Sequence, residues 1–205
     1  MVEPFMKISG LANLGLKARN SPVGPKNVKI MEVSNGGQIC LRLDSSNKKI
    51  LDLTEKTLGF SLPIKANTTT KKGKKTALWL GPNEWLIITE QPEHLHKTLT
   101  KMLKNYHFSV LIVTDSRTTI SISGKRARDV LKKGCGLDLH PNAFGPGDCA
   151  QTAFALSQVL IHQLSETKST KNATYHISVN RSFAEYIWAW LEDAAQEYGV
   201  EFGGN

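Results

Sequence analysis

The sequence predicts an α+β fold made of two packed ferredoxin-like units of the βαββαβ type. Two observations lead to this prediction. Between residues 38 and 113, short segments typical of strands are interrupted by two segments with the 3.6-residue period of helices. After residue 115 a similar order of strand and helix patterns begins again and ends in a long helical segment. At 205 residues the chain is long enough for two small units packed together.

The predicted first unit spans residues 28–114. Its expected elements are strands at 28–33, 38–43, 76–80, 84–89 and 109–113 and helices at 45–58 and 92–105. An Asn35-Gly36-Gly37 turn predicts that the first two strands form a hairpin, and Pro82 presets the turn of a second hairpin. The lysine-rich segment 65–76 is expected to be a polar, solvated connector, because it has no hydrophobic period.

The predicted second unit spans residues 115–205. Its expected elements are strands at 118–123, 150–156, 158–164 and 173–179 and helices at 125–133 and 182–198. The last helix is amphipathic, and Ser182 with Glu185 fits a capping box at its start. Residues 1–27, ahead of both units, have no regular period. They form either a frayed tail or an extended arm that lies on a partner.

A turn of Asp115, Ser116 and Arg117 joins the two predicted units. A serine beside an aspartate suggests a nucleophile, but a nucleophile needs a general base within hydrogen-bond reach. No Gly-x-Ser-x-Gly elbow surrounds this serine. We therefore interpret the turn as structural. Asp115 and Ser116 are expected to accept local backbone hydrogen bonds, and Arg117 is expected to pair with a carboxylate.

The charge of the chain is +8 overall but is unevenly distributed. Residues 1–75 carry +9, from fourteen basic and five acidic residues, whereas residues 182–205 carry −5. This asymmetry predicts partners of different sign at the two ends. The predicted helix at 125–133 carries five basic side chains, namely Lys125, Arg126, Arg128, Lys132 and Lys133. They form either an ordinary solvated face or a ridge that docks an acidic partner.

Three tryptophans are candidate subunit contacts. Trp79 and Trp85 flank the turn of the second predicted hairpin, where they either pack within the sheet or contact a partner. Trp188 lies on the opposite side of the last helix from Trp190, so both cannot face one sheet. We interpret Trp188 as a subunit contact, and the alternative is that a loop or the other unit covers it.

The sequence contains no motif for catalysis, cofactor binding or metal binding. Gly-x-Gly-x-x-Gly, P-loop and His-Glu-x-x-His patterns are absent, and Cys135, His140 and Cys149 match no common zinc spacing. We therefore expect no catalytic, cofactor or metal site on this chain. Three irregularly spaced cysteines argue against a disulfide framework and for a reducing compartment. Without a signal-peptide pattern or a long apolar stretch, the chain is expected to be cytoplasmic and to make no membrane contact.

Four segments resemble the gamma subunit family of heterotetrameric sarcosine oxidase. They are ALWLGPNEWLII (77–88), DSRTTISISGKRARDVLKKGCGLDLHP (115–141), FGPGDCAQT (144–152) and NRSFAEYIWAWLEDAAQEYG (180–199). The resemblance covers about residues 20–199. This family is similar in turn to the first part of the folate-binding fold of aminomethyltransferase (T-protein), in which an Asp/Ser turn, a strand and a Gly-x-x-Ala helix recur. Asp115, Ser116, Gly124 and Ala127 correspond to that pattern.

The resemblance implies a structural gamma subunit with no active site of its own. Its complex would oxidatively demethylate sarcosine to glycine and give 5,10-methylenetetrahydrofolate and hydrogen peroxide. The implied partners are alpha, beta and delta subunits, which would hold FAD, FMN, NAD, tetrahydrofolate and zinc. Two alternatives stay open: a stand-alone folate-binding or one-carbon protein, and a basic nucleic-acid-binding module. The second is disfavoured, because aromatic and basic residues do not alternate, and nucleic acid is not an expected partner.

Overall fold

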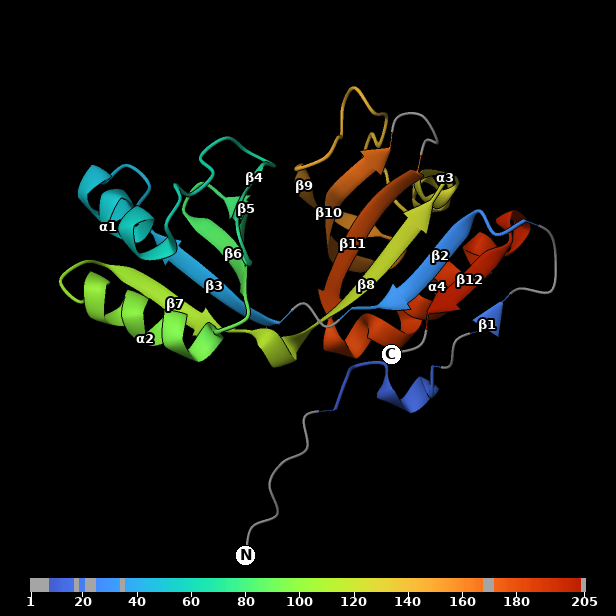
Figure 1. Cartoon of the computed structure of the whole chain (residues 1–205), viewed down its shortest axis with the longest axis horizontal. Helices are drawn as coiled ribbons and strands as arrows, with labels where there is room; N and C mark the ends of the chain where they lie inside the picture. Colours follow the sequence, from blue (N-terminus) through green and yellow to red (C-terminus); the bar gives the residue numbers. More distant parts are fainter. Residues whose placement is uncertain (1–7, 17–18, 21–24, 34–35, 168–171, 204–205) are drawn as a thin grey trace, which may run out of the picture.

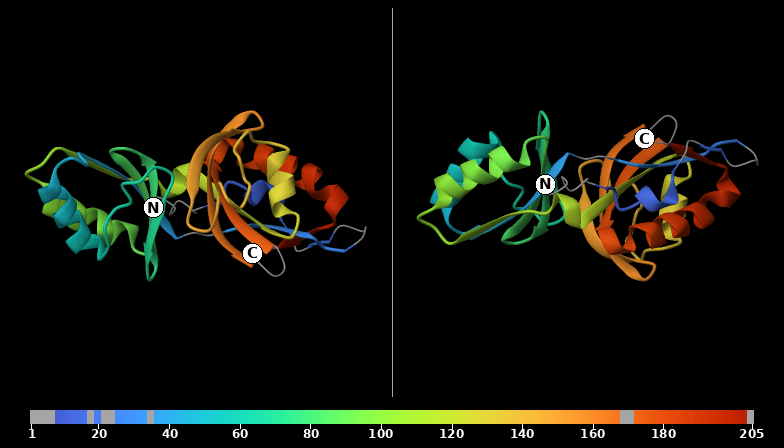
Figure 2. Two further views of the ribbon diagram at one scale, coloured as in Figure 1. Left: turned by 90° about the horizontal axis from the view of Figure 1, so that it is seen from above. Right: turned by 90° about the horizontal axis from the view of Figure 1, so that it is seen from below.

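The computed structural model describes residues 8–16, 19–20, 25–33, 36–167 and 172–203. Within these ranges the chain forms two β-sheets that stand side by side, with helices covering the far face of each sheet (Figure 1). Views from above and from below show the layers in the order helices, sheet, sheet, helices (Figure 2). The α+β class predicted from the sequence is therefore confirmed.

The five-stranded sheet has the strand order β4-β5-β6-β3-β7, and all its neighbouring strands are antiparallel. Its strands are β3 (Gly37–Leu43), β4 (Thr69–Lys72), β5 (Lys75–Gly81), β6 (Glu84–Thr89) and β7 (Phe108–Ile112). Helices α1 (Lys48–Leu58) and α2 (Pro92–Leu103) pack on one face. The chain order is β3-α1-β4-β5-β6-α2-β7, which is the expected βαββαβ order with the additional edge strand β4.

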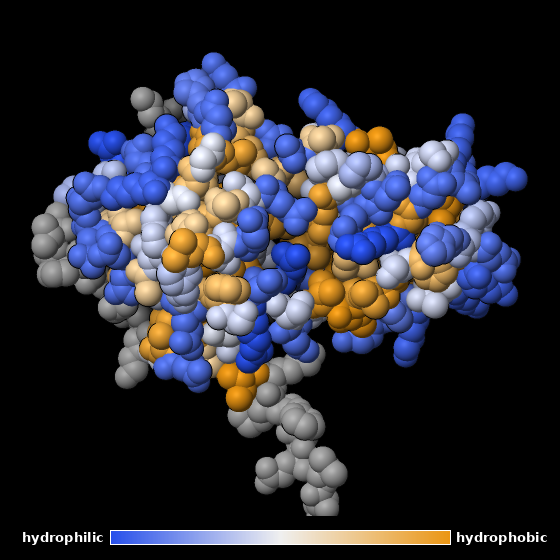
Figure 3. Space-filling view, turned by 180° about the vertical axis from the view of Figure 1, so that it is seen from behind, coloured by the Kyte–Doolittle hydropathy of each residue, from blue (hydrophilic) through white to orange (hydrophobic). Residues whose placement is uncertain are grey.

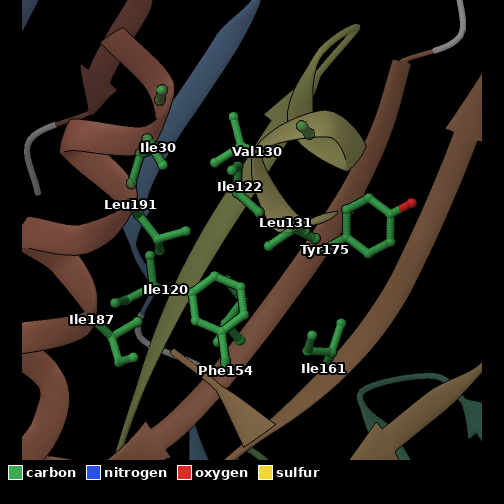
Figure 4. Packing of buried hydrophobic residues seen from close by; sticks show 14 of the residues in the cluster. Ile30, Ile120, Ile122, Val130, Leu131, Phe154, Ile161, Tyr175, Ile187 and Leu191 are labelled. Carbon is green, nitrogen blue, oxygen red and sulfur yellow. The ribbon is translucent and has the colours of Figure 1, made fainter. Parts of the chain in front are cut away.

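The seven-stranded sheet has the order β1-β12-β2-β8-β11-β10-β9. Its strands are β1 (Arg19–Asn20), β2 (Val28–Glu32), β8 (Arg117–Gly124), β9 (Cys149–Phe154), β10 (Ser157–Thr167), β11 (Asn172–Asn180) and β12 (Val200–Gly203). Helices α3 (Ala127–Lys132) and α4 (Ala184–Ala195) cover one face. Figure 4 shows how branched side chains from β8, including Ile120 and Ile122, meet Leu191 of α4 and Val130 of α3 in the core.

Four short 3₁₀ helices complete the described chain. They are η1 (Ala12–Leu14), η2 (Thr114–Ser116), η3 (Arg181–Phe183) and η4 (Gln196–Tyr198). No helix among the described residues is long and apolar enough to cross a membrane.

A small apolar cluster holds the two sheets together. Leu78 and Leu86 of the five-stranded sheet pack against Cys149 and Leu160 of the seven-stranded sheet. Hydrogen bonds join the same region, because the Thr69 hydroxyl donates to the carbonyl of Gly147 at 2.8 Å. The helix-free faces of the two sheets therefore meet along a seam.

Two predictions for the first half of the chain are wrong. Strands β2 and β3 do not form a hairpin: β2 pairs with β8 and β12, whereas β3 pairs with β6 and β7. Although β2 falls within the range 28–114, it belongs to the seven-stranded sheet. The chain crosses between the sheets here, and Asn35 of the expected turn lies outside the described residues.

The second error concerns segment 65–76, which is not a solvated connector but contains β4 and the beginning of β5. Lys72 and Lys75 donate from Nζ to the carbonyls of Gly59 and Leu58, at 2.7 and 3.2 Å. Carbonyls at a helix C-terminus lack partners within the helix, and a lysine side chain satisfies them. The lysines that suggested a loop thus anchor the β4–β5 hairpin to the end of α1.

Further differences lie at the ends of the chain. Helix α4 begins at Ala184 after η3 and has no side-chain cap, so the capping box predicted at Ser182 and Glu185 does not form. Strand β12 was not expected, because no element was predicted after residue 198, and the predicted helix 182–198 is divided into η3, α4 and η4. Part of the predicted arm, 1–27, lies outside the described residues, and in the described part Leu11 is buried in the core.

Candidate functional site

The predicted Asp115-Ser116-Arg117 turn lies where the chain passes from one sheet to the other. Helix η2 connects β7 to β8 at this point. The backbone of Gln38 holds η2 in place, since its N–H donates to the Thr114 hydroxyl at 2.9 Å and its carbonyl accepts from the Val113 N–H at 2.8 Å. The Ser116 hydroxyl donates to the Val113 carbonyl at 2.8 Å, so it is a donor here and not the expected acceptor. Local hydrogen bonds thus tie the turn to β3.

A pocket of about 360 Å³ opens at this crossing, and we call it the junction pocket. Its walls come from segment 8–10, the end of β2, the beginning of β3, η2, the beginning of β8 and the beginning of η3. Four charged side chains line it: Glu32, Asp115, Arg117 and Arg181. Among the described residues, neither Asp115 nor Arg117 forms an ion pair, so the expected pairing of Arg117 with a carboxylate is not found there.

Two buried polar groups in the wall of the junction pocket have no hydrogen-bond partner among the residues that the structure describes. They are the side-chain oxygen Oε1 of Gln38 and the hydroxyl of Thr119. The two residues are only 4% and 3% exposed. A buried polar group without a partner costs free energy, and in native proteins most such groups are satisfied. The junction pocket is therefore one of several places where buried polar atoms of the described residues lack a hydrogen-bond partner.

Segment 8–10 forms one wall of the junction pocket. The Ser9 hydroxyl donates to the carboxylate of Glu32, and Arg181 donates from Nη2 to the Ser9 carbonyl at 3.4 Å. Gly10 lies directly against Thr118, because a Cβ at this position would stand 2.2 Å from the Thr118 hydroxyl oxygen. The lack of a side chain at Gly10 is what allows this close approach.

The predicted basic ridge on the helix at 125–133 is only partly exposed. Arg128 points inward and forms two hydrogen bonds of 3.0 Å with the carboxylate of Glu166. It is therefore not part of an exposed docking ridge, which corrects the sequence interpretation. The reason is that Glu166, on β10, offers a carboxylate whose geometry matches the guanidinium fork.

Two further residues of that ridge are paired within the chain. Arg126 contacts Asp129 at 2.9 Å, and Lys133 forms an ion pair with Glu197 and donates to the Ala194 carbonyl at 2.6 Å. The remaining two, Lys125 and Lys132, are exposed and have no ionic partner among the described residues. These two stay predicted contact residues.

Two of the three candidate tryptophans are core residues, so Trp85 packs within the sheet, one of its two expected roles, and the interpretation of Trp188 as a subunit contact is corrected. Trp85 is fully buried, and its indole N–H donates to the Pro63 carbonyl at 2.8 Å. Trp188 is buried beneath β12, with its ring centroid 5.9 Å from that of Phe202. Trp79, opposite Trp85 in the β5–β6 hairpin, is partly exposed and stays a candidate.

The cysteines and histidines do not form a metal-binding cluster among the described residues. Burial raises the pKa of the Cys149 thiol to about 12, because the thiolate would lose its hydration. Burial lowers the pKa of His162 and of His176 to about 4, and His162 is lowered further by His176 and Lys71. At neutral pH these thiol and imidazole groups are therefore uncharged.

Sequence reasoning missed an exposed apolar edge. Leu111 and Ile112 of β7 are 58% and 41% exposed, and β7 pairs only with β3 among the described strands. Apolar side chains also reach the surface where the two halves of the molecule meet (Figure 3). The two consecutive apolar residues were visible in the sequence, but their position at a sheet edge depends on the topology.

Comparison with known protein families gives one match over most of the chain. The model described as "Sarcosine oxidase, gamma subunit family" matches residues 42–197. The sarcosine oxidase subunit gamma of Corynebacterium sp. (strain P-1) is 31% identical over 175 residues, which cover 85% of this chain and 83% of the relative. The subunit of the same name from Arthrobacter sp. is 32% identical over 142 residues, covering 69% and 67% of the two chains.

Two solved structures share the fold. A chain of the heterotetrameric sarcosine oxidase from Corynebacterium sp. U-96, in complex with pyrrole 2-carboxylate, matches with a TM-score of 0.80 and 27% identity, covering 93% of this chain and 95% of that chain. The aminomethyltransferase T of the glycine cleavage system from Bartonella henselae matches with a TM-score of 0.66 and 14% identity. That match covers 97% of this chain and 59% of the transferase, and it shows a common fold alone.

Proposed function

The chain belongs to the sarcosine oxidase gamma subunit family, and from this membership we propose that it is a non-catalytic structural subunit that holds larger subunits together. In the proposed complex, sarcosine is oxidatively demethylated to glycine, with 5,10-methylenetetrahydrofolate and hydrogen peroxide as further products. Alpha, beta and delta subunits are the proposed partners, and they would carry FAD, FMN, NAD, tetrahydrofolate and zinc. The proposed location is the cytoplasm.

The apolar edge of β7 is the observation in the structure that supports a contact with another subunit. An uncovered strand edge presents unpaired backbone N–H and C=O groups, which makes it a template for a strand of another chain. The register places Leu111 opposite Cys40 and Ile112 opposite Ile39, so the two side chains project from opposite faces of the sheet. A strand added beside β7 would therefore contact apolar side chains on both faces.

The positive charge of the five-stranded half also supports a contact with another subunit at β7. Residues 36–113, which form the five-stranded sheet and its helices, carry twelve basic and six acidic residues, a net charge of +6. At the opposite edge of this sheet, Thr68 beside β4 forms a single bridge with Asp148 of the other half. A partner that adds a strand at β7 is expected to present acidic side chains around it.

Co-expression with the neighbouring subunits tests the proposal. We expect the chain to elute with a flavin-coloured assembly, and we expect Leu111→Asp to reduce its recovery in that assembly at least several-fold. Leu111 is exposed, so the substitution should leave the isolated fold intact. Leu156→Asp, in the turn between β9 and β10, is the matched control at another exposed leucine. Failure of the wild-type chain to elute with the assembly would reject the function, whereas full recovery of Leu111→Asp would reject the β7 edge.

The comparisons do not favour the two alternatives, a stand-alone folate-binding protein and a nucleic-acid-binding module. Each has a clear signature. The first would bind tetrahydrofolate tightly as a purified chain, and the second would bind nucleic acid with an affinity that falls steeply as salt is raised.

A further inference from the structure

We propose that a pocket at the end of the β4–β5 hairpin binds the phosphate group of a small molecule. This pocket of about 350 Å³ lies between the hairpin, the C-terminal end of α1 and the beginning of α2, and we call it the basic pocket. The inference concerns the five-stranded half alone and does not depend on the proposed assembly.

The first argument is the charge of the basic pocket. Its charged side chains are those of Lys72, Lys74, Lys75 and Glu90. Three positive charges against one negative charge leave a formal charge of +2, with His94 counted as neutral. A phosphate monoester carries a charge of about −1.5 to −2 at pH 7 and has three strong acceptor oxygens. Its charge therefore balances that of the basic pocket, whereas a single carboxylate balances only half of it.

The second argument is the way in which the hairpin gathers its lysines. Lys72 and Lys75 are direct partners in the register of β4 and β5, so their side chains leave the same face of the sheet. Gly73, with φ of +57°, allows the tight turn between them, and Lys74 lies in that turn. Like charges directly opposite each other destabilise a sheet. A bound anion would remove part of this repulsion.

The third argument is the donor capacity of Lys72 and Lys75. Each donates one hydrogen bond to a carbonyl at the C-terminal end of α1, Lys72 to Gly59 at 2.7 Å and Lys75 to Leu58 at 3.2 Å. An ammonium group has three donors, so two N–H groups on each lysine have no acceptor among the described residues. The bonds to α1 hold both ammonium groups in place before a ligand arrives, which lowers the entropy cost of binding.

The third lysine, Lys74, has a partner that a phosphate group can replace. Lys74 pairs with Glu90 at 2.7 Å, and the two side chains are 76% and 58% exposed. An ion pair as exposed as this one contributes little to stability. Lys74 can therefore turn from Glu90 to an anion at small cost, and hydrogen bonds between ammonium and phosphate groups are of the stronger, charge-assisted kind.

The size of the basic pocket favours a phosphate monoester over free phosphate. A volume of about 350 Å³ lies at the lower end of the range for small-molecule sites, roughly 300–1,000 Å³. It is larger than a phosphate group alone requires, so a small organic part fits beside the phosphate. Leu95 supplies an apolar side chain to the lining for that part.

Titration of the full-length chain with glycerol 3-phosphate and with inorganic phosphate tests the inference. Binding is measured by NMR chemical-shift changes and by calorimetry, at an ionic strength kept constant with sodium chloride. We expect saturable binding, with shifts centred on residues 72–75 and 89–95, and we expect glycerol to cause none. Tighter binding of glycerol 3-phosphate supports a monoester, whereas equal or weaker binding overturns the monoester in favour of free phosphate.

Three variants locate the site, and one of them has the opposite sign. Lys74→Gln and Lys75→Gln should each weaken binding by about threefold to tenfold, because each removes a positive charge. Glu90→Gln should strengthen binding by about threefold, because it removes the competing carboxylate. The matched control is Lys101→Gln, near the far end of α2. It lies about 15 Å along the helix from Gln91, beyond the screening length of about 10 Å at 0.1 M salt, and should bind as the wild type does.

Three outcomes overturn the inference. The wild type shows no saturable binding at millimolar concentration, sodium chloride alone moves the same resonances as strongly, or the three pocket variants keep the wild-type affinity. Glu90→Gln separates lost binding from lost folding, since an unfolded chain cannot bind more tightly. Partner subunits are absent from every titration, so none of these outcomes depends on assembly.

Discussion

Arg128 and Glu166 meet through two parallel hydrogen bonds of 3.0 Å, although they are 38 residues apart in the chain. Their side chains are only 13% and 12% exposed. The guanidinium of Arg128 also lies 6.0 Å from the ring centre of Tyr175, and Gln163 donates to the same carboxylate at 3.2 Å. The pair fastens α3 to β10 and is a structural feature of the seven-stranded half.

Glu166→Ala should lower the free energy of unfolding by roughly 3 kcal/mol, because it leaves the Arg128 guanidinium nearly buried without its partner. The measurement is urea denaturation of the purified chain at neutral pH. The matched control is Lys74→Ala, which breaks the exposed ion pair between Lys74 and Glu90 and should cost less than about 1 kcal/mol. Equal losses in the two variants would contradict a structural role for the Arg128–Glu166 pair.

Trp188→Ala should destabilise the isolated chain by roughly 3–5 kcal/mol, since the buried indole fills the space between α4 and β12. Tyr186→Ala, two positions earlier on the same helix but exposed, should cost about 1 kcal/mol or less. Thermal unfolding of both variants provides the measurement. A stable Trp188→Ala chain that failed only in assembly would restore the interpretation of Trp188 as a subunit contact.

Local patterns were sufficient to predict much of the fold. Helices α1 and α2 and the β5–β6 hairpin follow from hydrophobic period and turn residues, both of which act between near neighbours. Strand pairing is different, because the Asn35-Gly36-Gly37 pattern says nothing about the preference of β2 for β8 and β12 over β3. Long-range pairing is decided by which apolar faces are buried together.

The candidate site was less predictable for the same reason. The sequence singled out Asp115, Ser116 and Arg117, but nothing in it indicated that Gln38 and Thr119 would come together beside them. The inward orientation of Arg128 depends on Glu166 on another strand. A side chain of a given type can therefore face either a partner or the core. Which of the two it faces depends on the residues that it meets in the folded chain.

Gly124→Ala should lower the free energy of unfolding by about 2 kcal/mol or more. Gly124 has φ of +121°, a conformation that residues with a side chain rarely adopt. A Cβ there would lie 2.2 Å from the carbonyl oxygen of Asn27, and that oxygen already accepts from the Arg126 N–H at 3.2 Å. The backbone at the beginning of β2 would have to move, and denaturant titration would record the loss.

Gly136→Ala is the control for this prediction, because a Cβ at Gly136 meets nothing within 4 Å and its φ is not positive. It should leave stability unchanged or raise it by up to about 1 kcal/mol, through a smaller entropy of the unfolded chain. If the Gly124→Ala chain were as stable as the Gly136→Ala chain, the backbone at Asn27 could move away from the new Cβ without loss of stability, which would contradict the prediction.

Stability should fall between pH 6.5 and pH 4 because of His162 and His176, which face each other across β10 and β11. Burial lowers the pKa of each to about 4 in the folded chain, whereas the unfolded chain has the ordinary value of about 6.5. Below pH 6.5 the unfolded state therefore binds more protons and is favoured. The contribution of the two neutral histidines to the free energy of unfolding is therefore complete above about pH 6.5. It decreases as the pH falls and is lost below the folded pKa of about 4.

The expected loss is at most roughly 3 kcal/mol for buried His162 and less for half-buried His176. Urea denaturation at half-unit steps between pH 4 and pH 7.5 gives the profile, and the double variant His162→Gln/His176→Gln should flatten it. His94→Gln, at an exposed position on α2, should leave the profile unchanged. An unperturbed carboxyl group has a pKa of about 4, so a decline that begins near pH 6.5 identifies the histidines. A double variant that keeps the full decline would assign it to other groups.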